Sequence, residues 1–308
     1  MNCHLTPELE TSDRHMLDLS IGIMAYNEEE GIGRLLDALL KQKLVHANLK
    51  EIIVVASGCT DRTEAVVRDF IKQDPRIHLI VQTRRKGKAS AVNRFLAVAS
   101  GHICILESAD TVPEPGAINR LTAPFVLPEV GMTGGRPIPI NSVNTFMGYA
   151  GHLLWSLHHA VSLTNPKLGE LVAFRNVVRE IPEDTAVDEA SIEAILTKTG
   201  YKLCYVPEAV VRNKGPETVR DFLRQRRRIA AGHAYLFRKH GYRVSTSRLT
   251  GILKMAIRYQ SWCMKHILWT LGTACLELTA RVLGTIDVYA RKHAPAIWDI
   301  SPSTKSWN

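Results

Sequence analysis

The chain has 308 residues, enough to bury a substantial core, and its 45% hydrophobic and 22% charged residues exclude wholesale disorder. Its six cysteines form no CxxC pair, which argues against a disulfide framework or a structural zinc site and suits a reducing cytosol. The N-terminus shows no charged-then-apolar signal segment, so we expect a cytoplasmic location.

The net charge of +9 is unevenly distributed along the chain. Residues 214–308 carry 17 Lys and Arg against 5 Asp and Glu, a net charge of +12, whereas residues 1–213 carry 22 against 25, a net charge of −3. A basic region of this kind favours an anionic membrane surface or a nucleic acid, or it is simply a solvated face. Because no zinc-finger, basic-zipper or RNA-binding-sheet motif is present, we do not expect nucleic acid as a partner.

Apolar runs alternate with helical patterns in the first third of the chain, after a loose leader over residues 1–17. This alternation predicts a mainly parallel sheet with helices on both faces. Capping boxes at Asn27 with Glu30 and at Asp61 with Glu64 predict two helix starts. The expected strands are 19–25, 51–57, 78–82 and 103–106, and the expected helices are 28–41, 62–72 and 90–99.

Proline and glycine punctuate residues 111–144, and a second mixed region with an expected strand at 202–206 runs to about Gly241. We expect a catalytic domain over 18–241, with halves at 18–115 and 116–241. Residues 242–308 then form a basic, amphipathic helical extension.

The extension carries a one-sided apolar stripe with helical spacing. Only 11 uncharged residues separate Lys265 from Glu277, whereas a membrane span needs about 20, so we do not expect a transmembrane helix. Two interpretations remain, a helix lying in the membrane interface and a helix packed on the domain, and the basic charge favours the first. The stripe consists of Leu271, Cys275, Leu278, Val282 and Ile286.

Polar residues follow three of the expected strands where the strands end. In an open parallel sheet, ligands bind beyond the carboxyl ends of the strands, so these groups predict a nucleotide crevice. Each cluster alone is also explained by ordinary turn and cap chemistry, as for Asn27 and Asp61. The clusters are Tyr26, Asn27 and Glu28; Ser57 to Asp61; and Glu107, Ser108 and Asp110.

With these residues, the sequence resembles the inverting GT-A glycosyltransferases of family 2. "IGIMAYNEEEGI" is similar to the family's first strand and turn, and "EIIVVASGCTDRT" to its second strand. "RKGKASAVNRFLAVASGHICILESADTVPEP" resembles the block that ends in "DAD", and the segment from "VDEASIEAIL" to "FLRQRRRIAAG" resembles the acceptor half with "ED" and "QxxRW". The resemblance implies a Rossmann-like GT-A fold over about residues 18–240 and a nucleotide-sugar donor.

The resemblance places the last Asp of the family's metal-binding "DxD" on Asp110 and replaces the first Asp by Ser108. A cation held by oxygen ligands, Mn²⁺ or Mg²⁺, stabilises the charge of a departing nucleoside diphosphate. A hydroxyl is a poorer ligand than a carboxylate, so either the diphosphate and waters complete the shell or metal affinity falls. Glu107 would point to the opposite face of the strand, so it is not assigned as a ligand. Asp110 could alternatively cap a turn before Pro113.

The acidic pair that faces the base in the family is Ala56–Ser57 here, which leaves the donor base open between UDP and GDP sugars. Asn27, Ser57 or Asp61, with Tyr26, Glu28 and backbone groups, would then hold the nucleoside. Lys88 and Asn93 match family positions near the nucleotide, and Lys88 could neutralise phosphate. A lone surface Lys is the alternative interpretation of Lys88.

Inversion at the anomeric carbon needs a base on the acceptor hydroxyl. The resemblance places this base on Asp188, with Glu189 as the second candidate, although both residues could simply cap a helix starting at Ser191. Gln225 and Arg228 of "QRRRI" lie on adjacent helical turns. We expect Gln225, Arg227 and Arg228 to contact phosphate or acceptor, with a solvated basic helix as the alternative.

The aromatic residue of "QxxRW" is Ile229, and several membrane spans are lacking, so the sequence favours transfer of a single sugar over polysaccharide synthesis. We therefore expect a metal-assisted inverting glycosyltransferase that acts on a lipid-linked or membrane-proximal acceptor, peripheral on the cytoplasmic face of a membrane. The alternative is a catalytically impaired relative that binds nucleotide sugar or acts as a scaffold, as Ser108, Ala56 and Ile229 would allow.

Overall fold

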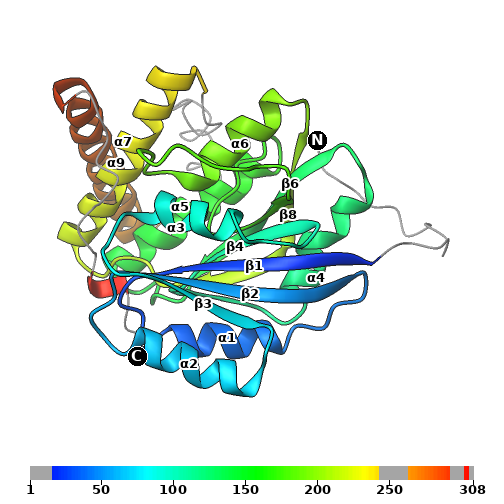
Figure 1. Cartoon of the computed structure of the whole chain (residues 1–308). Helices are drawn as coiled ribbons and strands as arrows, with labels where there is room; N and C mark the ends of the chain where they lie inside the picture. The colour runs from blue at the N-terminus through cyan, green and yellow to red at the C-terminus, as the bar shows by residue number, and fades with distance from the viewer. Residues whose placement is uncertain (1–15, 243–262, 292–301, 305–308) are drawn as a thin grey trace.

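The computed structural model describes residues 16–242, 263–291 and 302–304, drawn in colour in Figure 1. Most of the predicted leader (1–17) and part of the predicted extension (242–308) lie outside the described residues. The described chain forms one eight-stranded sheet with helices on both faces. Its strands are β1 (Leu17–Ala25), β2 (Ala47–Ser57), β3 (Ile77–Gln82), β4 (Ile103–Ser108), β5 (Thr111–Pro113), β6 (Val130–Pro139), β7 (Leu171–Arg175) and β8 (Lys202–Asn213).

The sheet has the order β3-β2-β1-β4-β7-β6-β8-β5. Strands β1 to β4 are parallel to one another, and β7 runs antiparallel to both β4 and β6. Strands β6 and β8 are again parallel, and β5 is antiparallel to β8. The predicted mainly parallel sheet is therefore confirmed, and each of the five predicted strands coincides with an observed strand. The carboxyl ends of β1, β2 and β4 lie at one edge of the sheet, where ligands of such folds bind.

Helices cover both faces of this sheet, with α1 and α2 below it and α3 and α6 above it in Figure 1. Side chains of β1 alternate between these layers. Ile21 and Ile23 pack with the α1 side, whereas Gly22 faces Phe95 of α3. A Cβ at Gly22 would come within 2.7 Å of the Phe95 ring, so this contact requires glycine. The helices are α1 (Ile32–Leu40), α2 (Thr63–Gln73), α3 (Lys88–Leu96), α4 (Ala117–Thr122), η1 (Ala123–Val126), α5 (Phe146–Ser162), α6 (Asp188–Lys198), α7 (Val219–His240), α9 (Met264–Arg291) and η3 (Pro302–Thr304).

The two predicted capping boxes are wrong. Helix α1 begins only at Ile32, after Gly31, and neither α1 nor α2 has a side-chain cap at its N-cap residue. Asn27 adopts a left-handed backbone conformation (φ 52°) and its Oδ1 accepts from Thr60 N at 2.8 Å. Asp61 Oδ2 accepts from the backbone N of Glu29 at 3.1 Å, and its Oδ1 accepts from the backbone N of Thr63, the first residue of α2, at 3.0 Å. Asn27 thus joins the loops that follow β1 and β2, whereas Asp61 joins these loops and also bonds the start of α2, without the reciprocal bond from Glu64 among the described residues that a capping box requires.

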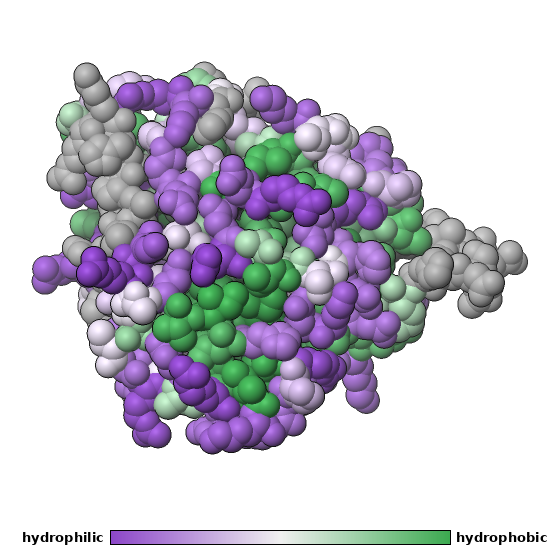
Figure 2. Space-filling model, viewed as in Figure 1, coloured by the Kyte–Doolittle hydropathy of each residue, from purple (hydrophilic) through white to green (hydrophobic). Residues whose placement is uncertain are grey.

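The view in Figure 2 shows hydrophobic residues gathered on the face toward the front of the sheet, bordered by hydrophilic ones. Strand β3 is the edge strand there, and its Val81 side chain is exposed. Hydrophobic residues therefore remain visible on this face, and Val81 lies on an edge strand that no other strand of the described residues covers.

Helix α9 packs along α7 (Figure 1). Its apolar residues face outward and its acidic residues face α7, the reverse of an ordinary surface helix. Its inner charged residues turn toward α7, where Glu277 accepts from Arg226 Nε and Asp287 from Arg227 Nε, each at 2.6 Å. The predicted apolar stripe is confirmed as one-sided, but it faces outward, with Leu278 57% exposed.

By length and composition, the α9 segment Met264–Ala290 could also cross a membrane, contrary to the expectation from its charges. A core helix of a soluble protein can meet the same criteria. Only 17% of its most apolar window is buried, so α9 is not a core helix.

Candidate active site

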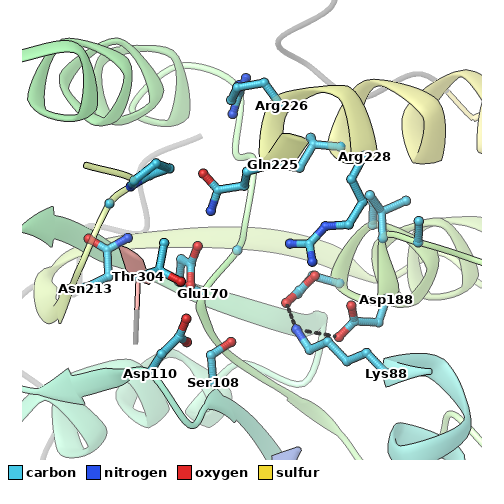
Figure 3. Close-up of a pocket in the computed structure, with 18 of the residues that line it drawn as sticks. Lys88, Ser108, Asp110, Glu170, Asp188, Asn213, Gln225, Arg226, Arg228 and Thr304 are labelled. Atoms are coloured by element: carbon cyan, nitrogen blue, oxygen red, sulfur yellow. Dashed lines mark hydrogen bonds and ion pairs between the residues drawn. The ribbon is translucent and has the colours of Figure 1, made fainter. Parts of the chain in front are cut away.

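A cavity of about 450 Å³ opens beyond the carboxyl ends of β1, β2 and β4 (Figure 3). It extends from these strand ends past the start of α6 to the facing sides of α5, α7 and α9. Ten of the predicted site residues line it, so most of the polar groups predicted from the sequence are brought together. These are Tyr26, Glu28, Ser57, Lys88, Ser108, Asp110, Asp188, Glu189, Gln225 and Arg228.

The strand-end side of the cavity carries an aromatic and a cationic group suited to a nucleotide. The Arg85 guanidinium carbon lies 4.2 Å from the centre of the Tyr26 ring, within cation–π distance. Gly58 lets the two loops approach, since its φ is 69° and a Cβ there would meet Arg85 N at 2.4 Å. The glycine of "ASGCTD" is thus required by backbone conformation and space, which places Arg85 over Tyr26 beside Ser57.

An ion cluster joins α3 to the start of α6. Lys88 Nζ lies 3.0 Å from Asp188 Oδ2 and 2.8 Å from Glu189 Oε1 (dashed lines in Figure 3). Burial and the neighbouring Glu189 raise the pKa of Asp188 to about 6, although Lys88 opposes this. Burial alone would lower the pKa of Lys88, but the two carboxylates outweigh it and raise that pKa. A carboxylate with a pKa near 6 is ionised at neutral pH and still able to take a proton.

The predicted helix-cap role of Asp188 and Glu189 does not apply, because α6 already begins at Asp188 and its N-cap residue is Val187. Asp188 is 3% exposed, and it faces the cavity rather than solvent. Lys88, which a lone-lysine interpretation would have left on the surface, is instead the cation shared by both carboxylates. The structure thus makes Lys88, Asp188 and Glu189 one unit inside the cavity.

Oxygen donors gather where β4 ends. Ser108 and Asp110 line the cavity, and Glu170, just before β7, points to the same region (Figure 3). Burial, followed by the charge of Asp110, raises the pKa of Glu170 to about 8. Glu107 does not line the cavity; it is buried and hydrogen-bonded to the Thr111 hydroxyl, in agreement with its expected opposite orientation.

This donor set fits a hard divalent cation, because carboxylate and hydroxyl oxygens are the ligands that Mg²⁺ and Mn²⁺ prefer. Two carboxylates that repel each other across a small space also favour a cation between or beside them. Among the residues that the structure describes, no group of three or more His, Cys, Asp or Glu could hold a metal by itself. The residues therefore fit a cation whose remaining ligands come from a diphosphate and water.

Helix α7, where we predicted contacts to phosphate or acceptor, lines the cavity, but it does so without one of the predicted arginines. Arg227 turns toward α9, where its Nε and Nη2 donate to Asp287 at 2.6 and 2.7 Å, and it does not line the cavity. Arg226 and Arg228 line it instead, together with Gln225 (Figure 3). The expected phosphate-binding role of Arg227 is thus corrected to a structural one, because an acidic partner from α9 takes up its guanidinium.

Three further predicted residues lie outside the cavity lining. Asn27 and Asp61 hold the loops after β1 and β2 together, as described above. Asn93 donates to the Ile181 carbonyl at 2.9 Å and accepts from Ile181 N at 2.8 Å, so it anchors the segment before α6. Their contribution to the cavity is to fix the loops that carry Tyr26, Ser57 and Asp188.

Several lining residues were not predicted from the sequence. Glu170 is a non-glycine residue with φ 63°, a conformation that carries a cost for a side chain with a Cβ, and no sequence signal marks it. Asn213 at the end of β8 and Thr304 of η3 also reach the cavity (Figure 3). Arg226 belonged to the recognised arginine run, and the helical spacing from Phe222 could have identified it.

The chain is similar in sequence to known glycosyltransferases. Residues 20–185, just over half of the chain, match the model of the family described as Glycosyl transferase family 2. The probable glycosyltransferase YdaM of Bacillus subtilis is 26% identical over 254 residues, covering 76% of this chain and 59% of the relative. A poly-beta-1,6-N-acetyl-D-glucosamine synthase of Staphylococcus epidermidis is 25% identical over 284 residues, covering 86% and 66%. The chain thus spans less than two thirds of the length of either relative.

The fold is similar to a solved structure. The mannosyltransferase PcManGT of Pyrobaculum calidifontis, in complex with GDP-Man and Mn²⁺, matches with a TM-score of 0.66 at 19% identity, covering 91% of this chain and 89% of that one. Together with the family match, this shows the GT-A fold. The chain belongs to glycosyl transferase family 2, a family of glycosyltransferases that use nucleotide-sugar donors.

Proposed function

We propose that the protein transfers a single sugar, with inversion, from a nucleotide-diphosphate sugar to a lipid-linked or membrane-proximal acceptor. The observation that carries this proposal is one cavity lined by both Asp110 and Asp188. The cavity contains oxygen donors for a cation that would stabilise the leaving diphosphate. It also contains a carboxylate whose pKa suits it to accept a proton from the acceptor hydroxyl. Tyr26 and Arg85, which lie against each other in the cavity wall, would contact the nucleoside.

In the proposed step, the Asp188 carboxylate accepts the proton of the acceptor hydroxyl. The hydroxyl oxygen forms a bond to the anomeric carbon, while the bond from that carbon to the diphosphate breaks and its electron pair stays on the diphosphate oxygen. Lys88 holds Asp188 in place through the 3.0 Å ion pair. Asp110 and Ser108 would hold the divalent cation, which stabilises negative charge on the leaving group when it is bound.

A UDP or GDP sugar is the proposed donor. PcManGT, which shares the fold, is described in complex with GDP-Man and Mn²⁺, and this supports a similar class of donor. The test is thermal unfolding of the full chain with UDP or GDP sugars, with and without Mn²⁺. A ligand at about a hundredfold excess over its Kd stabilises the folded state by about 2.7 kcal/mol, so a bound donor raises Tm. No shift with any donor in Mn²⁺ would refute nucleotide-sugar binding.

The outward face of α9 supports a location on a membrane. From Met264 to Ala290, Lys265 is the sole charged residue among the exposed positions, and the others include Leu268, Leu271 and Leu278. An exposed apolar stripe of this length is unusual for a protein surface in water but suits the interface of a bilayer. We propose that α9 holds the protein on the cytoplasmic face of an anionic membrane, where the basic charge of residues 214–308 adds attraction.

Vesicle sedimentation tests this location. Leu271→Glu with Leu278→Glu places two charges on the outward stripe, and Val45→Glu with Val98→Glu places two at exposed valines elsewhere. Burying one leucine is worth about 1.5–3 kcal/mol, so the first pair should weaken binding to anionic vesicles more than tenfold. The valine pair should sediment nearly as the unaltered protein. Equal sedimentation of both variants would contradict the membrane proposal.

A further inference from the structure

The cavity continues past Gln225 into a chamber enclosed by α5, α7 and α9. Each helix presents one face to it, because its lining residues recur every three or four positions. Part of the wall is apolar, with Met147 and Leu154 on α5 and Phe222 and Ile229 on α7. These helices line the chamber, whereas Tyr26 and Ser57, from the loops and strand ends of the sheet, line another part of the same cavity.

The remaining wall of the chamber is predominantly basic. Lys167, Arg226 and Arg281 line it, and Glu277 accepts from Arg226 Nε at 2.6 Å and from Arg281 Nε at 2.8 Å. Both oxygens of the Glu277 carboxylate therefore already accept hydrogen bonds from guanidinium groups. The other acid in the lining near Lys167 is Glu193, which accepts from Leu168 N at 2.7 Å. Three cations thus share two carboxylates, both already hydrogen-bonded.

Two polar side chains of this chamber, His158 and Lys167, have groups without a hydrogen-bond partner among the described residues. His158 is 8% exposed and lines the cavity, and its Nδ1 has no hydrogen-bond partner among the described residues. The described residues show no hydrogen bond or ion pair to the Lys167 ammonium, although the charges of Glu193 and Glu277 act on it. Burial, with the charges of Lys167 and Arg226 nearby, lowers the pKa of His158 well below its usual value, so the ring is neutral and can donate one N–H. Unpaired buried donors of this kind cost free energy unless a ligand pairs them.

We infer that the chamber binds a phosphate or diphosphate group of the acceptor, through Lys167, Arg226, Arg281 and His158. This inference rests on the proposed transferase function. Phosphate oxygens accept hydrogen bonds from ammonium, guanidinium and imidazole groups, and their charge offsets the excess of cations. The apolar wall of Met147, Leu154, Phe222 and Ile229 accommodates the uncharged part of the same molecule.

Gln225 and Arg228 connect the chamber to the reacting centre. They lie on adjacent turns of α7, and in Figure 3 the Arg228 guanidinium lies near Asp188 and Lys88, while Gln225 lies between Arg226 and Glu170. The same continuous cavity is lined by Lys167 at the chamber and by Asp188 at the start of α6. One acceptor can therefore place its phosphate on the basic wall and a free hydroxyl beside the Asp188 carboxylate. The acceptor class is a phosphate-bearing alcohol, either soluble or anchored to a lipid.

The test uses the full chain with Mn²⁺ and a saturating nucleoside diphosphate, so that the donor site is occupied. Two probes carry a phosphate monoester: glycerol 3-phosphate in solution, and phosphatidic acid in phosphatidylcholine vesicles. Vesicles with phosphatidylglycerol instead measure general attraction to anionic lipid. Lys167→Met and Arg281→Met each remove one cation, and Lys239→Met is the matched control, since Lys239 lies on α7 outside the lining and pairs with Asp184 at 2.7 Å.

We expect Lys167→Met and Arg281→Met to weaken phosphate binding by about tenfold or more, as loss of a charge-assisted hydrogen bond does. Lys239→Met should bind as the unaltered protein. Stronger binding of glycerol 3-phosphate supports a soluble acceptor, and stronger binding of phosphatidic acid than of phosphatidylglycerol supports a lipid one. Retained nucleotide binding shows that each variant is folded, and two variants guard against misfolding of one.

Equal phosphate binding by the two chamber variants and the control would overturn the inference, as would no phosphate binding by the unaltered protein. Either result, with nucleotide binding intact, leaves the proposed transferase function standing. Failure of the unaltered protein to bind any nucleotide with Mn²⁺ overturns the proposed function and this inference with it.

Discussion

Replacement of Asp188 by Asn tests the role of the buried carboxylate most directly. Asn has the shape of Asp, but it carries no charge and does not accept a proton. A positioned general base contributes about 10²–10⁴ in rate, equivalent to about 2.7–5.5 kcal/mol of barrier. We therefore expect kcat of Asp188→Asn to fall by that factor, measured as release of nucleoside diphosphate with acceptor present. Donor affinity should stay close to that of the unaltered protein, since Asp188 lies at the acceptor side.

The pH dependence gives a second measurement of the same group. The pKa of Asp188 is raised to about 6, and only the ionised form can accept a proton. At pH 5 roughly a tenth of the carboxyl is ionised, so kcat/KM should be about tenfold lower than on its plateau above pH 7. In Asp188→Asn this acid limb should disappear. The direction is fixed, because a base loses activity as the pH falls through its pKa.

Glu189→Gln is the matched control, since Glu189 shares Lys88 with Asp188 and lines the same cavity. It should keep most of the turnover, and the acid limb should persist but move to lower pH, because the charge of Glu189 helps to raise the pKa of Asp188. A turnover of Asp188→Asn close to that of the unaltered protein would refute the base assignment, and a large loss confined to Glu189→Gln would transfer the role to Glu189. Nucleotide binding without any turnover in the unaltered protein would favour the binding or scaffold alternative.

Three further changes separate binding, packing and charge. Asp110→Asn should weaken Mn²⁺-dependent nucleotide binding in calorimetry, and affinity that does not depend on metal would contradict the cation site. Arg227→Ala should lower stability by about 2 kcal/mol in denaturant unfolding, because the buried Asp287 loses the two hydrogen bonds that the Arg227 guanidinium donates, but it should leave nucleotide binding unchanged. Glu170→Gln, measured with a chelator present, should raise Tm more at pH 8 than at pH 5. The raised pKa of Glu170, about 8, means that its contribution to stability is lost as pH rises from about 4.5 to 8.

The fold was predictable because its strands are apolar runs that alternate with helical patterns. The sequence pattern was less informative in residues 111–144. The many prolines and glycines there gave no strand pattern, and the ten-residue strand β6 in the second half of the sheet was not predicted. Strand β6 pairs with β8, more than 60 residues later, and such a pairing leaves no local signal. The first half of the sheet could therefore be predicted from the sequence, and the second half only in part.

The sequence predicted the site residues whose role depends on residue type. It did not predict correctly the residues whose role depends on how the helices pack. Asp110, Lys88 and Asp188 were found by their motifs and do line the cavity. Arg226 and Arg227 are adjacent and chemically equal, and successive helical residues point about 100° apart. Which of them faces the cavity is decided by α9, where Asp287, 60 residues further along the chain, accepts hydrogen bonds from Arg227.

Helix α9 connects the two proposals through the way its charges are arranged. Glu277 and Arg281 face inward and line the chamber, while Leu278 and Val282, one residue further along in each case, face outward and are at least half exposed. A surface helix in water would have the opposite arrangement, with its charges outward. The arrangement is favourable if the outer face of α9 contacts the apolar interior of a membrane and its inner face lines a chamber that binds an anion. The outer face of α9 and the chamber would then be separated by about one helix diameter, roughly 10 Å. A phosphate headgroup could therefore reach the chamber while its lipid remains at the bilayer.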